Sequence, residues 1–127
     1  MKRTTIILLL IAAILSVDVL ATGCGDQSEQ ADRLIDEVNG IATTIEPKVK
    51  QADSLMTQAT EQLSQGKLTD EKTTLTKAQS LVDEIIADLK MAKSKTDEAA
   101  ALKISDDSRK YLEANGRALQ ANINMWS

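Results

Sequence analysis

Apolar side chains return every three or four residues along positions 31–63. One series repeats every seven residues, a second lies three positions after it, and a third lies four positions after it. The three series are Ala31, Val38, Ile45, Ala52 and Ala59; Leu34, Ile41 and Leu55; and Ile35, Ala42, Val49, Met56 and Leu63. This spacing gathers the apolar side chains on one face of an α-helix. The pattern therefore predicts a helix from about Ser28 to about Ser64.

Pro47 lies inside this helical pattern. A proline has no N–H to donate and its ring crowds the carbonyl group four residues earlier, here that of Thr43. The neighbouring Asn39-Gly40 pair also weakens the helix. The seven-residue series nevertheless passes Pro47 without a change of phase. We expect one helix that is kinked near Pro47, and the alternative is two helices that meet near Glu46, which would give four helices in all.

A second helix is expected after the turn Gln65-Gly66-Lys67, where Gly66 suits a helix C-terminus. Thr69 is the expected N-cap, with Asp70 and Glu71 in the first turn. The helix should reach about Ala101, since two apolar series continue through it. These series are Leu68, Leu75, Val82 and Leu89, and Ala78, Ile85, Ala92 and Ala99.

A third helix is expected to start at Ser105, which Asp106 and Asp107 follow. Its apolar stripe is looser than the others and has Asn115 in the middle, where an asparagine sets register or faces a buried water. The stripe consists of Ile104, Tyr111, Leu112, Ala118, Leu119, Ile123 and Trp126. Because no segment alternates with the period of a strand, we predict an all-α fold. Short connections and many alanines favour an antiparallel three-helix bundle with coiled-coil-like packing.

The first 24 residues have the pattern of an export signal. Lys2 and Arg3 precede an apolar run over residues 6–17 that only Ser16 interrupts. The run is shorter than the ~20 residues that span a membrane, but it fits the apolar core of a signal peptide. It is followed by the segment Leu20-Ala21-Thr22-Gly23-Cys24.

This segment resembles the signal of bacterial lipoproteins, in which small residues precede a cysteine. The resemblance implies that a diacylglycerol joins the Cys24 thiol and that cleavage before Cys24 follows. It departs from the commonest pattern in having Ala21, rather than a leucine, three positions before the cysteine. We expect a signal peptide over 1–23, a lipidated tether over 24–30 and a helical bundle over 31–127. Two alternatives remain: an uncleaved membrane helix over 4–22, against which Asp18 argues, and ordinary cleavage after Ala21.

Composition narrows the chemistry of the mature chain. The sequence has no histidine, and Cys24 is its only cysteine, which excludes an intrachain disulfide. Without residues 1–23, which hold Lys2, Arg3 and Asp18, the net charge becomes −5, so we expect no nucleic-acid partner. Adjacent acids point in different directions on a helix. We therefore expect no catalytic, metal or cofactor site from the pairs Asp36-Glu37, Asp83-Glu84 and Asp106-Asp107, nor from the capping segment Ser64-Gln65-Gly66-Lys67.

These features favour a non-catalytic structural or protein-interaction module that its N-terminal lipid holds at the outer or periplasmic face of a membrane. The protein is similar in kind to helical envelope lipoproteins such as the murein lipoprotein, although that resemblance is limited to the signal and the heptads. An unidentified protein partner is expected. We expect the acidic excess before Lys67 to form a solvated face, and the alternative is a docking face for a cationic partner. The alternative is a small-ligand-binding lipoprotein with a pocket lined by Met56, Leu89, Tyr111 or Trp126.

Overall fold

The computed structural model describes residues 27–127, and these residues form three helices and no strand. Helix α2 spans Ser28–Ser64, α3 spans Leu68–Ala100 and α4 spans Asp106–Trp126. The all-helical fold class and the three helices are therefore confirmed. The leader over 1–23 and Cys24 lie outside the described residues, whereas the last three residues of the expected tether, 28–30, belong to α2.

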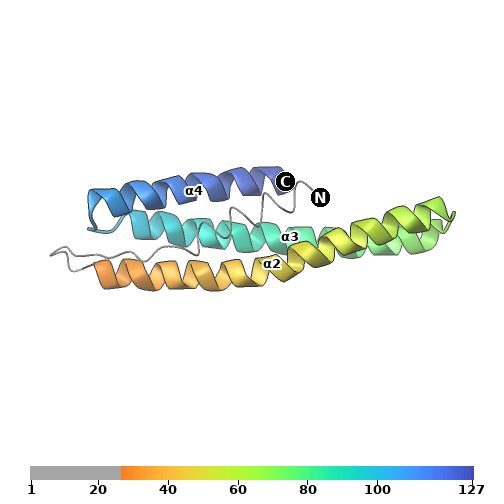
Figure 1. Cartoon of the computed structure of the whole chain (residues 1–127), viewed down its shortest axis with the longest axis horizontal. Coiled ribbons are helices and arrows are strands. Elements are labelled where there is room, and N and C mark those ends of the chain that lie inside the picture. The colour runs from red at the N-terminus through yellow and green to blue at the C-terminus, as the bar shows by residue number, and fades with distance from the viewer. Residues whose placement is uncertain (1–26) are drawn as a thin grey trace.

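The three helices form an elongated body. Figure 1 shows α3 returning along α2 and α4 lying on α3 over one half of the hairpin. Two clusters of buried side chains hold the helices together, and each cluster draws on all three helices. The larger cluster contains Ile45, Ile85 and Leu119, and the smaller one contains Leu34, Ala99 and Leu112. No Cα atom of α4 comes within 8 Å of one in α2, so α3 is the backbone neighbour of both other helices.

The seven-residue series of α2 is buried as the pattern predicted. None of Ala31, Val38, Ile45, Ala52 and Ala59 exposes more than 3% of its surface. Alanines at these positions let the backbones of α2 and α3 approach closely, since a small side chain leaves little to separate two helices. The buried face thus follows from the order of residues along the helix.

Helix α2 runs through Pro47 without interruption. The alternative of two helices meeting near Glu46 is therefore wrong. Proline removes one backbone hydrogen bond, and the buried neighbours Ile45 and Val49, which expose 1% and 2%, hold the turns on either side against the core. The kink near Pro47 stays a prediction.

The turn between α2 and α3 closes the end of α2. Gly66 has a φ of +71°, in the left-handed region that favours glycine. The Gly66 N–H donates to the Leu63 carbonyl (3.0 Å) and the Lys67 N–H donates to the Gln62 carbonyl (2.9 Å). This pair of bonds is the Schellman arrangement, which satisfies carbonyls that a helix end otherwise leaves open.

The expected N-cap at Thr69 is wrong. Helix α3 begins at Leu68, its N-cap is Lys67, and no side chain caps it. The turn at Gly66 leads directly into the new helix, since the Lys67 carbonyl already accepts from the Glu71 N–H at 3.0 Å. The expected start of α4 is confirmed: Ser105 is the N-cap, and its Oγ accepts from the Ser108 N–H at 3.2 Å.

Two glycines should respond to alanine with opposite signs. A Cβ at Gly40 would meet nothing within 4 Å, so Gly40→Ala should raise the free energy of unfolding by about 0.5–1 kcal/mol through helix propensity. Gly66→Ala should lower it by about 1 kcal/mol, because its φ is positive. Urea denaturation measures both values. Equal shifts of one sign would contradict the conformations at these two positions.

Candidate functional site

Apolar side chains become exposed toward the end of the hairpin that α2 and α3 form. On α3 the exposed fraction rises from 1% at Leu89 to 37% at Leu75 and 65% at Leu68. On α2 it rises from 2% at Val49 to 51% at Met56, and Leu63 exposes 53%. We call the four exposed side chains of this region the end ladder: Met56, Leu63, Leu68 and Leu75.

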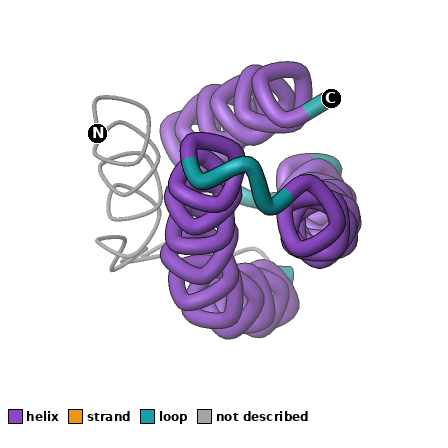
Figure 2. The backbone as a smooth tube through the Cα atoms, turned by 90° about the vertical axis from the view of Figure 1, so that its right-hand side faces the viewer, coloured by secondary structure: helices purple, strands orange, loops and turns teal. Residues whose placement is uncertain are grey.

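Helix α4 stops before it reaches the end ladder. Its last helical residue, Trp126, packs against the cluster that contains Ile85 and Leu89. Figure 1 shows the hairpin continuing beyond the end of α4, and in Figure 2 the turn of the hairpin lies nearest the viewer with α4 set behind it. Leu75 and Leu68 thus continue the face of Leu89 past the point where α4 ends.

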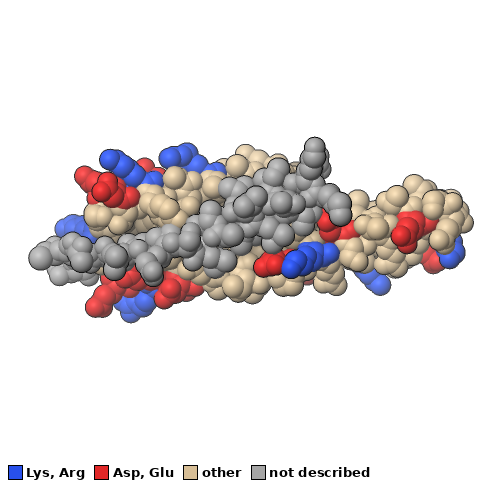
Figure 3. Space-filling view, viewed as in Figure 1, with Lys and Arg blue, Asp and Glu red and all other residues tan. Residues whose placement is uncertain are grey.

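An open depression on α3 lies in the same region. Leu75 forms part of its floor, and polar side chains surround it, among them Lys72, Gln79 and Asp83. Leu75 and Gln79 lie one helical turn apart, as do Gln79 and Asp83. On the side drawn in Figure 3, this end of the hairpin is mostly uncharged surface, with acidic and basic side chains scattered over it. Apolar groups with a polar rim are typical of a surface that binds another protein.

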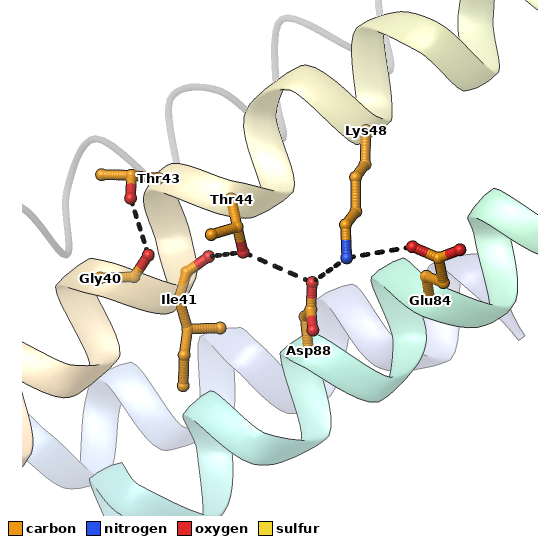
Figure 4. Close-up of polar contacts among 7 residues, drawn as sticks. All are labelled: Gly40, Ile41, Thr43, Thr44, Lys48, Glu84 and Asp88. Carbon is orange, nitrogen blue, oxygen red and sulfur yellow. Dashed lines mark hydrogen bonds and ion pairs between the residues drawn. The ribbon is translucent and has the colours of Figure 1, made fainter.

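A polar network joins α2 to α3 nearer the middle of the hairpin. The Lys48 Nζ atom lies 2.7 Å from Asp88 Oδ2 and 3.2 Å from Glu84 Oε2 (Figure 4). The Thr44 hydroxyl donates to the Ile41 carbonyl at 2.7 Å and lies 3.5 Å from Asp88 Oδ2. A second ion pair joins Lys95 of α3 to Glu37 of α2. These contacts fix which residues of the two helices face each other.

The charge on Lys48 is stabilised by its neighbours. The hydrogen bond to Asp88 raises the pKa of the Lys48 ammonium above its ordinary value of 10.5, and Glu84 acts in the same direction. Partial burial opposes this by disfavouring the charged form. Since the pKa is higher in the folded state, protonated Lys48 stabilises the fold below the unfolded-state pKa. That contribution is lost as the pH rises through the folded-state pKa.

Lys48→Met should therefore destabilise the protein modestly and in a pH-dependent way. At neutral pH we expect a loss of about 0.5–1 kcal/mol, the range of partly exposed ion pairs. The difference from the parent protein should shrink as the pH rises beyond 10.5 and through the higher folded-state pKa, where Lys48 of the folded protein loses its proton. Lys50→Met is the matched control, because Lys50 pairs only within α2, with Glu46. Urea denaturation at pH 7 and pH 11 measures the effect, and an unchanged difference would contradict it.

At least one member of each acidic pair takes part in an ion pair or a hydrogen bond. Glu37 and Glu84 face lysines of the opposite helix, and Asp106 lies 3.4 Å from Arg109. Asp83 accepts from Gln79 at 3.0 Å. Within residues 27–127 no three acidic or cysteine side chains gather as metal ligands would.

The residues proposed to line a ligand pocket lie in different parts of the fold. Met56 is exposed on the end ladder, Leu89 and Trp126 belong to the larger cluster, and Tyr111 packs against the smaller one. Ser64 donates to the Glu61 carbonyl at 2.7 Å, in keeping with a capping role. The structure therefore brings Leu89 and Trp126 to one cluster but does not join all four candidates in one pocket.

A buried amide that the sequence did not single out lies on α4. Asn122 exposes 2% of its surface, whereas Asn115, the expected buried asparagine, is half-buried. The Asn122 Nδ2 donates to the Ala118 carbonyl at 3.1 Å, and its Oδ1 has no hydrogen-bond donor among the described residues. Asn122 lies one position before Ile123 of the apolar stripe, and this adjacency is the only signal the sequence offers.

Among residues 27–127, no helix combines the length and the apolar character that crossing a bilayer requires. No protein-family model matches the chain, and no curated protein or solved structure is significantly similar to it.

Proposed function

We propose that the protein is a lipid-anchored, non-catalytic module of the cell envelope that presents an interaction surface at a distance from the membrane. The anchor is the lipid on Cys24, which the segment Leu20–Cys24 supports through its resemblance to lipoprotein signals. Helix α2 begins at Ser28, four residues after Cys24, so the tether between lipid and helix is short.

The observation that carries this proposal is the place of the end ladder. Helix α2 has 37 residues and is therefore about 55 Å long at 1.5 Å per residue. Its first residue follows the anchor, and Met56 and Leu63 lie near its other end. Apolar side chains that are costly to expose thus lie far from the bilayer, where a protein partner can cover them.

We further propose that α2 and α3 pack as an antiparallel coiled-coil-like pair with a bend at Pro47. Three interhelical contacts, Glu37–Lys95, Lys48–Glu84 and Thr44–Asp88, join residues whose numbers add to the same value, 132. A constant sum is the signature of two helices that run in opposite directions with equal rise. The buried series at seven-residue spacing supports knobs-into-holes packing.

Intact-mass analysis of the native protein tests the anchor. The expected species begins at Cys24 and carries the added mass of a diacylglycerol, with or without an acyl group on the new amine. Cys24→Ser should remove this mass and leave the leader in place. A native protein that keeps its full unmodified N-terminus, or that begins at Thr22 without lipid, would overturn the proposal.

A further inference from the structure

We propose that the end ladder binds the end ladder of a second copy of this chain in an inverted arrangement, so that the two hairpins overlap only at their ends. The inference comes from the described residues and not from the lipid. Because the reversal places Ser28 of the two copies at opposite ends of the dimer, two lipid-anchored copies would pair in this way from facing membranes.

The end ladder continues a regular series of paired positions. Successive pairs across the hairpin are Ala42 with Leu89, Val49 with Val82, Met56 with Leu75 and Leu63 with Leu68, and in each pair the numbers add to 131. The residue numbers of the interhelical polar contacts add to 132, which differs from 131 by only one. The two members of each apolar pair therefore lie at nearly the same height along the hairpin axis. The first two pairs are largely buried, and the last two form the exposed ladder.

Two exposed pairs make a surface that complements itself. When a second hairpin approaches with its direction reversed, Met56 of each copy faces Leu63 of the other copy. Leu75 of each copy then faces Leu68 of the other. Every side chain of the end ladder thus meets another apolar side chain, and the contact has the two-fold symmetry that most homodimers use. The four hairpin helices become a short four-helix bundle.

Helix α4 selects the reversed orientation. In a side-by-side approach with both hairpins pointing the same way, α4 of one copy would occupy the place that the other hairpin needs. In the reversed approach the hairpins overlap only beyond α4, over the open depression on α3 (Figures 1 and 2). The turn of each copy then lies next to the end of α4 at Trp126 of the other copy. Helix α4 forms a second layer on the hairpin, and a hairpin has the same thickness of one helix. The hairpin of the second copy therefore extends this second layer beyond the end of α4.

The charges beside the ladder fit the same arrangement. With Met56 level with Leu63 of the second copy, Asp53 lies level with the second copy's turn, where Lys67 is located. The pairing occurs twice because of the two-fold symmetry. Opposite charges at the rim favour this register over one shifted by a helical turn. The exposed apolar area is on the order of a few hundred Å² per copy, which places the contact among weak, concentration-dependent interfaces.

Cysteine crosslinking tests the geometry directly. Thr60 lies on α2 between Met56 and Leu63 and on the same face, so the two-fold axis brings Thr60 close to Thr60 of the second copy. In the full chain with Cys24→Ser, purified in a non-ionic detergent, Thr60→Cys should form a disulfide dimer on mild oxidation. Ser54→Cys is the matched control, because Ser54 is also exposed but lies on the opposite face of α2.

A second variant tests whether crosslinking at position 60 depends on the end ladder or results from random collision. Leu68→Glu, at a position that is 65% exposed, should leave the helix content and melting temperature nearly unchanged. In the Thr60→Cys background it should reduce the crosslinked fraction at least fivefold, because it places charges against Leu75 of the second copy. Equal crosslinking at positions 54 and 60, no crosslinking at 60, or crosslinking that Leu68→Glu leaves unchanged would each overturn the proposal. Because all arms lack the lipid, failure here is distinguishable from failure of the anchor.

Discussion

Ile85→Ala should lower the free energy of unfolding by about 3–4 kcal/mol, the largest loss that we expect from a single core truncation. Ile85 exposes none of its surface and lies in the larger cluster, where α2, α3 and α4 meet. Truncation removes apolar contacts to all three helices and leaves a cavity that rigid helices fill poorly. Urea denaturation followed by circular dichroism measures the loss.

The neighbouring isoleucine supplies the control. Ile86 has the same chemistry and helical environment but is only half-buried, so Ile86→Ala should cost clearly less, about 1 kcal/mol. Equal losses at the two positions would show that helix propensity or the unfolded state, rather than the cluster around Ile85, determines the stability. A loss below 1 kcal/mol at Ile85 would contradict the packing described for the larger cluster.

Cys24→Ser should change the N-terminus and the mass of the native protein more than any other single substitution. If the lipid on Cys24 is processed as we propose, the parent protein sediments with membranes, resists extraction by salt and is released by detergent. The serine variant cannot form the thioether, so its precursor should keep the leader. Membrane fractionation combined with mass analysis separates a lipid anchor from a retained leader, because both sediment but only one carries added mass.

Ser16→Ala is the control for this experiment, since it keeps the apolar run of the leader and leaves Cys24 in place. It should be processed and anchored like the parent protein. Identical masses and identical fractionation of the parent and the Cys24→Ser protein would remove the basis for a lipid anchor.

Helix boundaries and the buried face of α2 could be predicted because they depend on which residues follow one another in the sequence. The predicted range of α2 agrees with the structure at both ends, since the apolar series stops where Gly66 turns the chain. The start of α4 was predictable for the same reason: Ser105 caps it with its own side chain. Thr69 failed as a cap because the turn at Gly66 already supplies the geometry that a capping side chain would provide.

The end ladder could not be predicted from the apolar pattern, which treats every position of a series as equivalent. Val49 and Met56 differ by seven positions and have the same place in the pattern, yet one is buried and the other half exposed. The difference depends on where α4 ends in space, and that follows from the lengths of two helices and the loop between them. The partnerless Oδ1 of Asn122 is likewise a property of the packed helices and not of the local sequence.

The position of α3 between the other two helices also has a mechanical consequence. The backbone of α4 lies beside that of α3 and not beside that of α2, whereas ion pairs at Lys48 and at Glu37 join α2 to α3. A pull on the C-terminus away from the hairpin would therefore separate α4 from the hairpin one helical turn at a time. A pull along the axis of the hairpin would instead shear many contacts between α2 and α3 at the same time. The hairpin would therefore transmit tension along its length, and α4 would detach before α2 and α3 separate.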